Sequence, residues 1–315
     1  YTSILFGSSI VIILLFLING IFRGAGDASI AMRSLWIANI CNIILCPTLI
    51  YGIGSWPGLG LTGAALATAI GRGIGVTYQL FHLFSGKGII KVRWQHFKPD
   101  WKIIGSLFHL SWTATIQFLI ASASWIVLTK IISQFGSAAI AGYTVAMRVI
   151  MFFILPAWGM SNAAATLVGQ NLGAALPERA EQSVWKTAKY NAIFMSVVSL
   201  VFLLFSTEII LFMNNDREVE KIATQALRIV SLGYVFYGVG MVITSAFNGA
   251  GDTKTPTWIN LFGFWAFQIP LAYLFAITWE LGPKGVFFAV IIAEAAITVA
   301  GIIIFRKGWW KSIKV

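Results

Sequence analysis

Four side chains that can bind ions or protons interrupt long apolar stretches of this chain. Asn39, Asn42 and Cys46 stand at i, i+3 and i+7, so a helix would place them on one face. Glu294 is the only carboxylate deep within an apolar stretch. Polar and ionisable groups inside a membrane are costly and usually face protein or water. These residues are therefore candidates for substrate or ion binding.

Two further amides, Asn19 and Gln117, lie in other apolar stretches. For Asn19, Asn42 and Gln117, the sequence leaves two interpretations open: a hydrogen bond or packing between helices, or a place in the lining of a cavity. For Glu294 the alternatives are a protonation site and a structural role. In the structural role it would be half of a buried pair, with Arg148 as one candidate partner, or a neutral hydrogen-bonding acid.

The patterns expected of an enzyme are missing from the sequence. It contains no HExxH motif, no P-loop and no plausible Ser/His/Asp arrangement. His82, His96 and His109 cluster near a basic stretch without the spacing of metal ligands. We therefore expect no enzymatic activity, no metal site and no cofactor.

The composition indicates the elements that must hold these residues. The chain is 58% hydrophobic and 10% charged, which excludes a soluble globule. A span of a hydrocarbon core of about 30 Å takes roughly 20 helical residues. Nine apolar stretches have suitable lengths: 1–22, 34–54, 61–84, 104–133, 138–170, 187–213, 221–247, 256–278 and 285–305. No alternation typical of a β-barrel appears, so we predict an all-α, polytopic integral membrane protein.

One short motif occurs twice, each time between two apolar stretches. Its glycine and aspartate positions are Gly24, Gly26 and Asp27 in the first copy and Gly249, Gly251 and Asp252 in the second. We interpret each copy as a tight turn followed by an Asp that caps the next helix. The duplication predicts a bundle of two repeated lobes. The second copy follows four apolar stretches of its lobe, whereas the first copy follows only one. We therefore expect that three helices are missing before the first copy, and that the nine stretches are part of a bundle of twelve helices.

From this duplication we expect three regions. Residues 1–84 are the remainder of an N-terminal lobe, residues 85–103 are a basic cytoplasmic linker, and residues 104–315 are a complete C-terminal lobe. The net charge is +11, and alternate loops hold fifteen Lys and Arg residues against four. This bias places the duplicated loops and the C-terminus in the cytoplasm. It also favours a lipid bilayer as the partner, with no nucleic acid.

The order and spacing of several motifs resemble the multidrug and toxic compound extrusion (MATE) family. The resemblance rests on the duplicated motif, in which Arg23 precedes the first copy, on Arg148, and on residues 168–174, which include Gln170. It covers essentially the whole chain. It implies two six-helix lobes, alternating access and export of cationic or amphipathic drugs and toxic compounds, driven by an H⁺ or Na⁺ gradient. On this basis we expect a monomer in the cell membrane.

The same resemblance bears on the polar residues. Asn19 and Asn42 match an ion-responsive network of some relatives, but Cys46 stands where those relatives carry an Asp, which removes a titratable carboxylate. Two other functions remain open: a flippase for lipid-linked oligosaccharides of the same superfamily, which would need a strongly cationic cavity, and a membrane fragment that does not transport.

Overall fold

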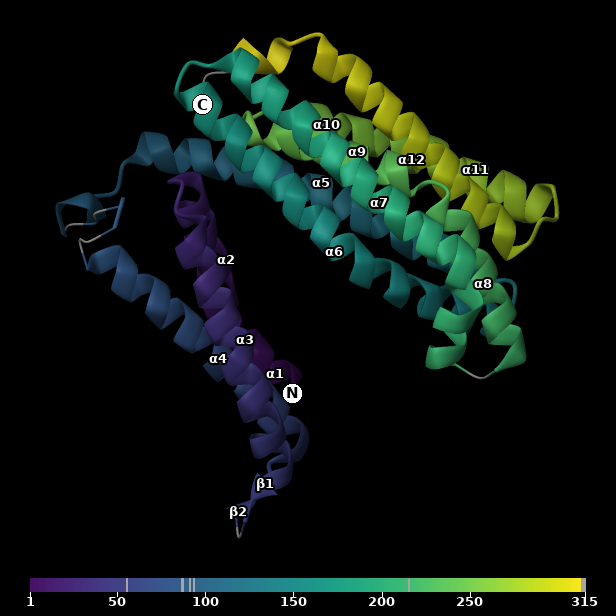
Figure 1. Ribbon diagram of the computed structural model, residues 1–315, viewed down its shortest axis with the longest axis horizontal. Coiled ribbons are helices and arrows are strands. Elements are labelled where there is room, and N and C mark those ends of the chain that lie inside the picture. Colours follow the sequence, from purple (N-terminus) through teal and green to yellow (C-terminus); the bar gives the residue numbers. More distant parts are fainter. Residues whose placement is uncertain (55, 86–87, 91, 93, 215, 313–315) are drawn as a thin grey trace. The chain divides into compact units, whose positions relative to one another are not determined.

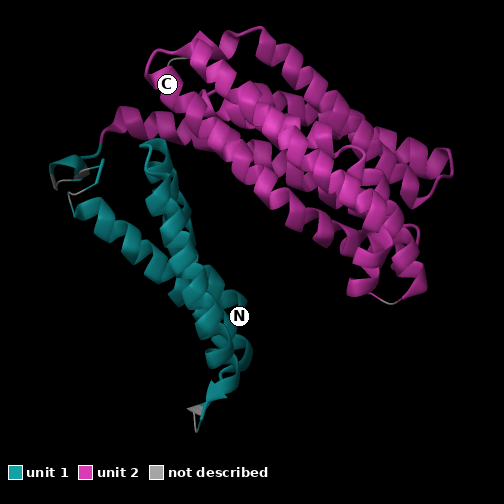
Figure 2. Cartoon of the chain, in the orientation of Figure 1, with its two compact units in different colours: residues 1–99 teal, residues 100–315 magenta. Residues whose placement is uncertain are grey.

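The computed structural model describes the chain except for residues 55, 86–87, 91, 93, 215 and 313–315. It divides into two compact units, Tyr1–Pro99 and Asp100–Val315 (Figure 2). Both units consist mainly of long helices (Figure 1). The linker predicted over 85–103 includes residues 86, 87, 91 and 93, which lie outside the described part.

The first unit is a small bundle of apolar helices with one short hairpin. Its elements are α1 (Thr2–Gly7), α2 (Ser9–Gly24), α3 (Ala28–Tyr51), β1 (Gly52–Ile53), β2 (Trp56–Pro57), α4 (Gly60–Phe84) and the 3-10 turn η1 (Trp94–Phe97). The two strands are antiparallel, with Gly52 opposite Pro57. Helix α4 packs against both α2 and α3. Leu15, Phe22 and Val76 lie at the centre of this packing.

Glycines let α3 and α4 approach closely. A Cβ atom on Gly63 would lie 2.2 Å from the carbonyl oxygen of Leu49. On Gly71 it would lie 2.8 Å from the carbonyl oxygen of Ala38. Small residues at such contacts are typical of helices packed within a membrane, because lipid supplies no hydrophobic force that drives helices together.

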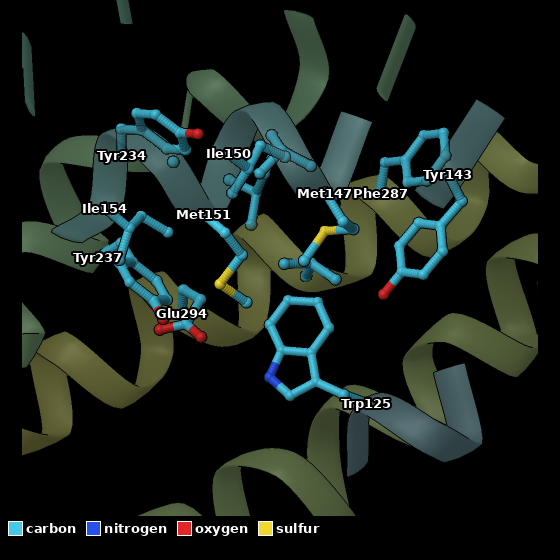
Figure 3. Close-up of a pocket in the computed structure, with 14 residues that line it drawn as sticks. Trp125, Tyr143, Met147, Ile150, Met151, Ile154, Tyr234, Tyr237, Phe287 and Glu294 are labelled. Atoms are coloured by element: carbon cyan, nitrogen blue, oxygen red, sulfur yellow. The ribbon is translucent and has the colours of Figure 1, made fainter. Parts of the chain in front are cut away.

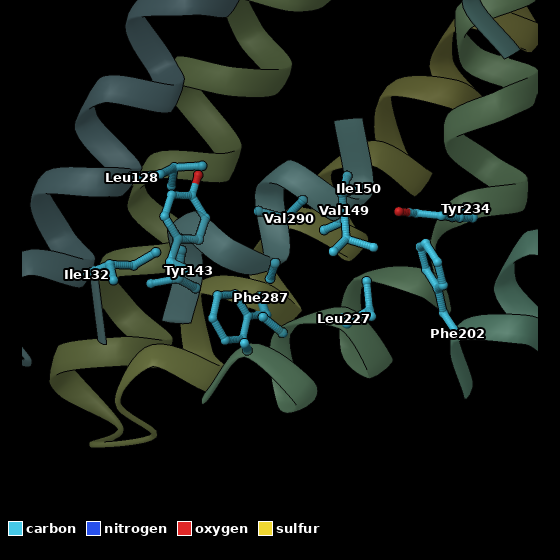
Figure 4. Close-up of a cluster of buried hydrophobic side chains, with 14 of the residues drawn as sticks. Leu128, Ile132, Tyr143, Val149, Ile150, Phe202, Leu227, Tyr234, Phe287 and Val290 are labelled. Carbon is cyan, nitrogen blue, oxygen red and sulfur yellow. The ribbon is translucent and has the colours of Figure 1, made fainter. Parts of the chain in front are cut away.

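The second unit is a larger helical bundle. Its elements are α5 (Trp101–Ser133), α6 (Ser137–Gly173), α7 (Pro177–Met213), α8 (Arg217–Ser231), α9 (Tyr234–Gly249), α10 (Lys254–Asn260), the π-helical η2 (Leu261–Gln268), α11 (Ile269–Tyr273), the π-helical η3 (Leu274–Thr278), α12 (Pro283–Arg306) and the 3-10 turn η4 (Trp309–Ser312). Helix α6 packs against α7, α8 and α9, and α12 packs against α8 and α9. Figure 4 shows part of the resulting core, where the rings of Phe202 and Tyr234 meet edge to face at 5.6 Å.

The structure confirms the all-α membrane class but gives a lower number of clear spans. Six of the described helices are long and apolar enough to cross a membrane, or seven if the bent pair α8–α9 is one span. The prediction of nine is therefore too high by this criterion. Helix α2 has only 16 residues. Helix α4 is long enough but contains several glycines together with Arg72 and Gln79, which lower its apolar character.

The two copies of the duplicated motif fold into the same turn. The amide of Asp27 donates to the carbonyl oxygen of Phe22 at 2.9 Å, and the amide of Asp252 donates to that of Phe247 at the same distance. The residue before each Asp is a glycine with positive φ, +90° at Gly26 and +81° at Gly251. This is the Schellman arrangement, in which glycine adopts the left-handed conformation without strain from a Cβ atom.

Each aspartate of the motif also contacts the start of the following helix. The Asp27 Oδ1 accepts from the amide of Ile30 at 3.3 Å, at the beginning of α3. The Asp252 Oδ1 accepts from the amide of Thr255 at 3.0 Å, and its Oδ2 accepts from the Thr255 hydroxyl at 2.6 Å. Acceptors at this position satisfy amides that have no partner within the helix. The sequence repeat is therefore also a repeat of local structure.

Candidate functional site

Glu294 is a carboxylate that α12 holds deep inside the second unit. The helix begins at Pro283, and Glu294 lies near its middle with 7% of its surface exposed. Among the described residues, no Lys or Arg lies within ion-pair distance of this carboxylate. Arg148, one candidate partner, is exposed on α6. The buried Arg148–Glu294 pair expected under one interpretation is therefore not formed, because Arg148 projects away from the buried face of its helix.

Glu294 lines a small cavity of about 30 Å³ whose other walls are mostly aromatic and thioether side chains (Figure 3). We call it the aromatic cavity. Trp125 reaches it from α5, Met151 from α6 and Tyr234 from α9. Aromatic faces attract cations, and methionine adapts to irregular apolar shapes. This lining suits a small group that carries a positive charge.

A second, larger and more open cavity of about 330 Å³ is also lined by Glu294. We call it the polar cavity. Gln117 lines it from α5, Asn248 from α9 and Asn260 from α10. Tyr237 borders both cavities, as Glu294 does. The structure thus brings together two residues that the sequence singled out, Gln117 and Glu294, and adds two amides that it did not.

A break between α8 and α9 shapes the aromatic cavity. The two helices meet at 57°, and Gly233 lies at the break. The Ser199 hydroxyl donates to the carbonyl oxygen of Ser231 at 2.7 Å, which satisfies a group freed by the break. As a result, the first turn of α9 borders the cavity that contains Glu294. The positive end of a helix dipole stabilises negative charge nearby.

The aromatic cavity contains a polar group without a partner. The hydroxyl of Tyr234 is buried and has no hydrogen bond to any described residue. Buried polar groups are nearly always paired, so an unpaired one in a cavity is available to a ligand. The sequence analysis missed Tyr234 and Tyr237. Their spacing of three residues on one helix face was the available signal, but tyrosine is common in packed cores.

The first unit contains a separate polar cluster made by Asn19, Ser34 and Gln79. The Gln79 Nε2 donates to the Asn19 Oδ1 at 2.7 Å and to the Ser34 hydroxyl at 2.9 Å. The Ser34 hydroxyl lies 3.1 Å from the same Asn19 oxygen. All three side chains are buried, and they come from α2, α3 and α4. Asn19 thus links three helices, and the sequence analysis had missed its two partners.

The three predicted residues of α3 do not form a cluster of this kind. The Asn42 Nδ2 donates to the Thr68 hydroxyl of α4 at 3.3 Å. Cys46 is half-buried, and Asn39 is exposed. The face of α3 that carries Asn39, Asn42 and Cys46 is therefore only partly covered by protein, because Asn39 is exposed while the other two are half-buried.

The residues of the family-like motifs lie outside both cavities. None of the following lines either one: Arg23, Gly24, Gly26, Asp27, Arg148, Gln170, Gly249, Gly251 and Asp252. In the described part of the chain, no three His, Cys, Asp or Glu side chains gather as metal ligands. The arrangement that can do chemistry is thus Glu294 between an aromatic and an amide-rich cavity.

Comparison with known proteins identifies relatives of the whole chain. The MatE family model matches residues 114–274. The "Probable multidrug resistance protein YoeA" of Bacillus subtilis (strain 168) is 27% identical over 289 residues, which is 91% of this chain and 62% of the relative. The "Probable multidrug resistance protein NorM" of Thermotoga maritima is 23% identical over 311 residues, 99% of this chain and 67% of the relative. The chain thus spans about two thirds of these relatives' length.

Solved structures share the fold. The "Crystal structure of MATE in the straight conformation" superposes with a TM-score of 0.91 at 24% identity, over 98% of this chain and 68% of that one. The structure "Reverse polarity of binding pocket suggests different function of a MOP superfamily transporter from Pyrococcus furiosus Vc1 (DSM3638)" gives the same score and identity over 99% of this chain and 69% of that one. At this level of identity the likeness establishes the fold alone.

Proposed function

We propose that this chain, which belongs to the MatE family, forms most of a secondary-active antiporter. The transporter exports cationic or amphipathic toxic compounds by alternating access, driven by an H⁺ or Na⁺ gradient. Relatives named as multidrug resistance proteins and a multi-pass helical fold support this proposal. The observation that carries it is Glu294, a buried carboxylate with no basic partner among the described residues, placed between two cavities.

Glu294 can couple two ligands because its single negative charge accepts one positive charge at a time. A proton or Na⁺ neutralises the carboxylate in one step of the cycle. A cationic group of the substrate that reaches into the aromatic cavity does the same in another step, and it also gains contacts with Trp125 and the tyrosines. Binding of one ligand then weakens binding of the other, which is the energetic coupling that antiport requires.

The polar cavity gives the site a second role. Gln117, Asn248 and Asn260 present amide donors and acceptors near Glu294. Oxygen atoms of such amides can complete the shell of a Na⁺ ion, while a proton needs only the carboxylate. Asn19, Asn42 and Cys46 belong to the first unit, and we propose that they support its packing or line its own cavity.

The lining of the cavities disfavours a flippase for lipid-linked oligosaccharides. A pyrophosphate headgroup requires a cationic site, because arginine and lysine provide the charge-assisted hydrogen bonds that hold phosphates. Of the described residues that line the two cavities, none is Lys or Arg, and Glu294 is acidic.

Several features of the whole transporter follow from the same proposal. Residues 1–84 are part of one lobe, 85–103 a linker and 104–315 the second lobe. The duplicated loops and the C-terminus face the cytoplasm, in accordance with the bias of basic residues. The protein acts as a monomer in the cell membrane.

Glu294→Gln in the full-length protein tests the proposal, because glutamine keeps the size of the side chain but cannot ionise. Export from proteoliposomes is measured with an H⁺ gradient and a Na⁺ gradient imposed separately. We expect the variant to insert normally and to lose export under the gradient that drives the wild type. Glu280→Gln, which neutralises an exposed carboxylate of the same unit, is the matched control. Full export by Glu294→Gln would disprove the coupling role.

A further inference from the structure

A groove runs along the surface of the second unit between α10–η2 and α12. It has a volume of about 570 Å³ and is distinct from the two cavities: of its described lining residues, Ile297 also lines the polar cavity and none lines the aromatic cavity. Trp258 and Phe262 form one wall and are 58% and 60% exposed. Ala296 and Ala300 lie on the other wall, one helical turn apart. The groove is therefore apolar along most of its length.

The length of the groove matches one leaflet of a bilayer. Its lining extends from Thr255 to Phe267 on one side and from Ala296 to Lys307 on the other. At about 1.5 Å per α-helical residue, the α12 wall is roughly 16 Å long. Half of the hydrocarbon core of a membrane measures about 15 Å. A single acyl chain that enters at one end would thus fill the groove.

A close contact between the two walls forms the floor of this path. Gly263 faces α12 so closely that a Cβ atom would lie 2.3 Å from the Cγ1 of Ile297. The surrounding segment, η2, is a π-helix, a rare form that is frequent at functional sites. The small residues of α12 complete the depression. The shape of the groove is thus determined by the packing of η2 against α12.

The end of the groove at Lys307 is positively charged. The Lys307 Nζ lies 5.1 Å from the centre of the Trp309 ring and has no ion pair among the described residues. Lys311, by contrast, already forms two ion pairs, because its Nζ lies 3.0 Å from Glu178 and 2.6 Å from Glu181. Among the described residues that line the groove, Lys307 is the one basic group, so it can receive an anion at this end.

We propose that this groove binds an anionic phospholipid. One acyl chain lies along Trp258, Phe262 and Ala300, and the phosphate binds the Lys307 ammonium group beside the Trp309 ring. Tryptophan is enriched at the level of lipid headgroups, where its apolar ring and its N–H group are both satisfied. The charge of Lys307 selects an anionic headgroup over a zwitterionic one, and the apolar walls hold the chain. The proposal does not depend on the transported substrate.

Native mass spectrometry of the detergent-purified, full-length protein tests this site. Phosphatidylglycerol and phosphatidylcholine are added separately, and the fraction of protein that retains one lipid is measured. We expect the wild type to prefer phosphatidylglycerol. Lys307→Gln should reduce its retention about fivefold, the effect of about one charge near a membrane surface. Lys254→Gln removes an exposed charge near the same end that does not line the groove, and it should retain the lipid as the wild type does.

A second variant separates the chain site from the charge. Ala300→Phe fills the groove and should reduce retention of both lipids, while Lys307→Gln should affect only phosphatidylglycerol. The two lipids retained equally by the wild type, or phosphatidylglycerol retained equally by the wild type and Lys307→Gln, would overturn the proposal. Normal retention by Ala300→Phe would also overturn it.

Discussion

Tyr237 on α9 and Glu294 on α12 are the two residues that border both the aromatic and the polar cavity of the second unit. They come from helices that pack against each other. A ligand in either cavity therefore meets the same carboxylate and the same tyrosine. This arrangement allows a small ion and a larger substrate to compete for one charge from two sides.

Tyr237→Phe should change the coupling without changing the fold. The hydroxyl of Tyr237 can donate a hydrogen bond to a charged Glu294 or accept one from its protonated form, and phenylalanine can do neither. We expect the concentration of the driving ion that gives half-maximal export to shift several-fold. Tyr143→Phe, which lies only in the aromatic cavity, is the control. If Tyr237→Phe and the wild type reach half-maximal export at the same concentration of the driving ion, Tyr237 has no role in coupling.

Gln79→Leu should destabilise the first unit. The substitution keeps much of the volume but removes the donor that bonds Asn19 at 2.7 Å and Ser34 at 2.9 Å. Loss of such buried bonds costs about 1 kcal/mol. The thermal unfolding midpoint in detergent should therefore fall by a few degrees. Asn39→Leu changes an exposed amide of the same unit and should leave the midpoint nearly unchanged. Equal effects of both variants would contradict this role of the cluster.

Alanine substitutions at Gly24 and Gly249 should have different outcomes, although the two glycines hold the same place in the duplicated motif. A Cβ atom on Gly249 would lie 2.3 Å from the carbonyl oxygen of Ala165, so α6 and α9 would have to separate. On Gly24 it would meet none of the described atoms within 4 Å. We expect a loss of about 1–3 kcal/mol for Gly249→Ala and little change for Gly24→Ala. Thermal unfolding of the two variants, compared at the same protein concentration, checks this difference.

Lys311→Gln should lower stability at neutral pH. Hydrogen bonds to Glu181 and Glu178 raise the pKa of Lys311 above its ordinary value of 10.5. A raised pKa means that the folded state favours the charged lysine, so the stabilisation is fully present below pH 10.5 and is lost as the pH rises through the folded-state value. We expect a lower unfolding midpoint than in the wild type at pH 7 and a smaller difference as the pH rises through the folded-state pKa of Lys311. Lys307→Gln, without an ion pair in the described residues, is the control.

Cysteine labelling checks the orientation in the membrane. In a variant without Cys41 and Cys46, Arg179→Cys should react with an impermeant maleimide only after the cells are opened. Lys284→Cys should react in intact cells. Both side chains are exposed at the ends of their helices, α7 and α12. The reverse labelling pattern would contradict the membrane topology that the distribution of Lys and Arg residues predicts.

Local features of this protein could be predicted from the sequence. The apolar stretches predict helices, because within lipid a helix satisfies its own backbone groups. The turns at Gly26 and Gly251 follow from neighbouring residues only, since glycine permits the left-handed conformation and the next Asp caps a helix. The unusual position of Glu294 in an apolar stretch was also visible. In each of these cases the deciding interactions lie within a few residues.

Contacts between helices were decided by the tertiary structure alone. The sequence does not show that Gln117 and Glu294 share a cavity, or that Asn19 bonds Ser34 and Gln79. It also offered Arg148 as a partner for Glu294, whereas Arg148 is exposed. The physical reason is that lipid-facing and protein-facing sides of a membrane helix are both apolar, so hydrophobicity does not mark the inner face. Rotation of each helix, its breaks and its closest glycine contacts decide which polar groups meet.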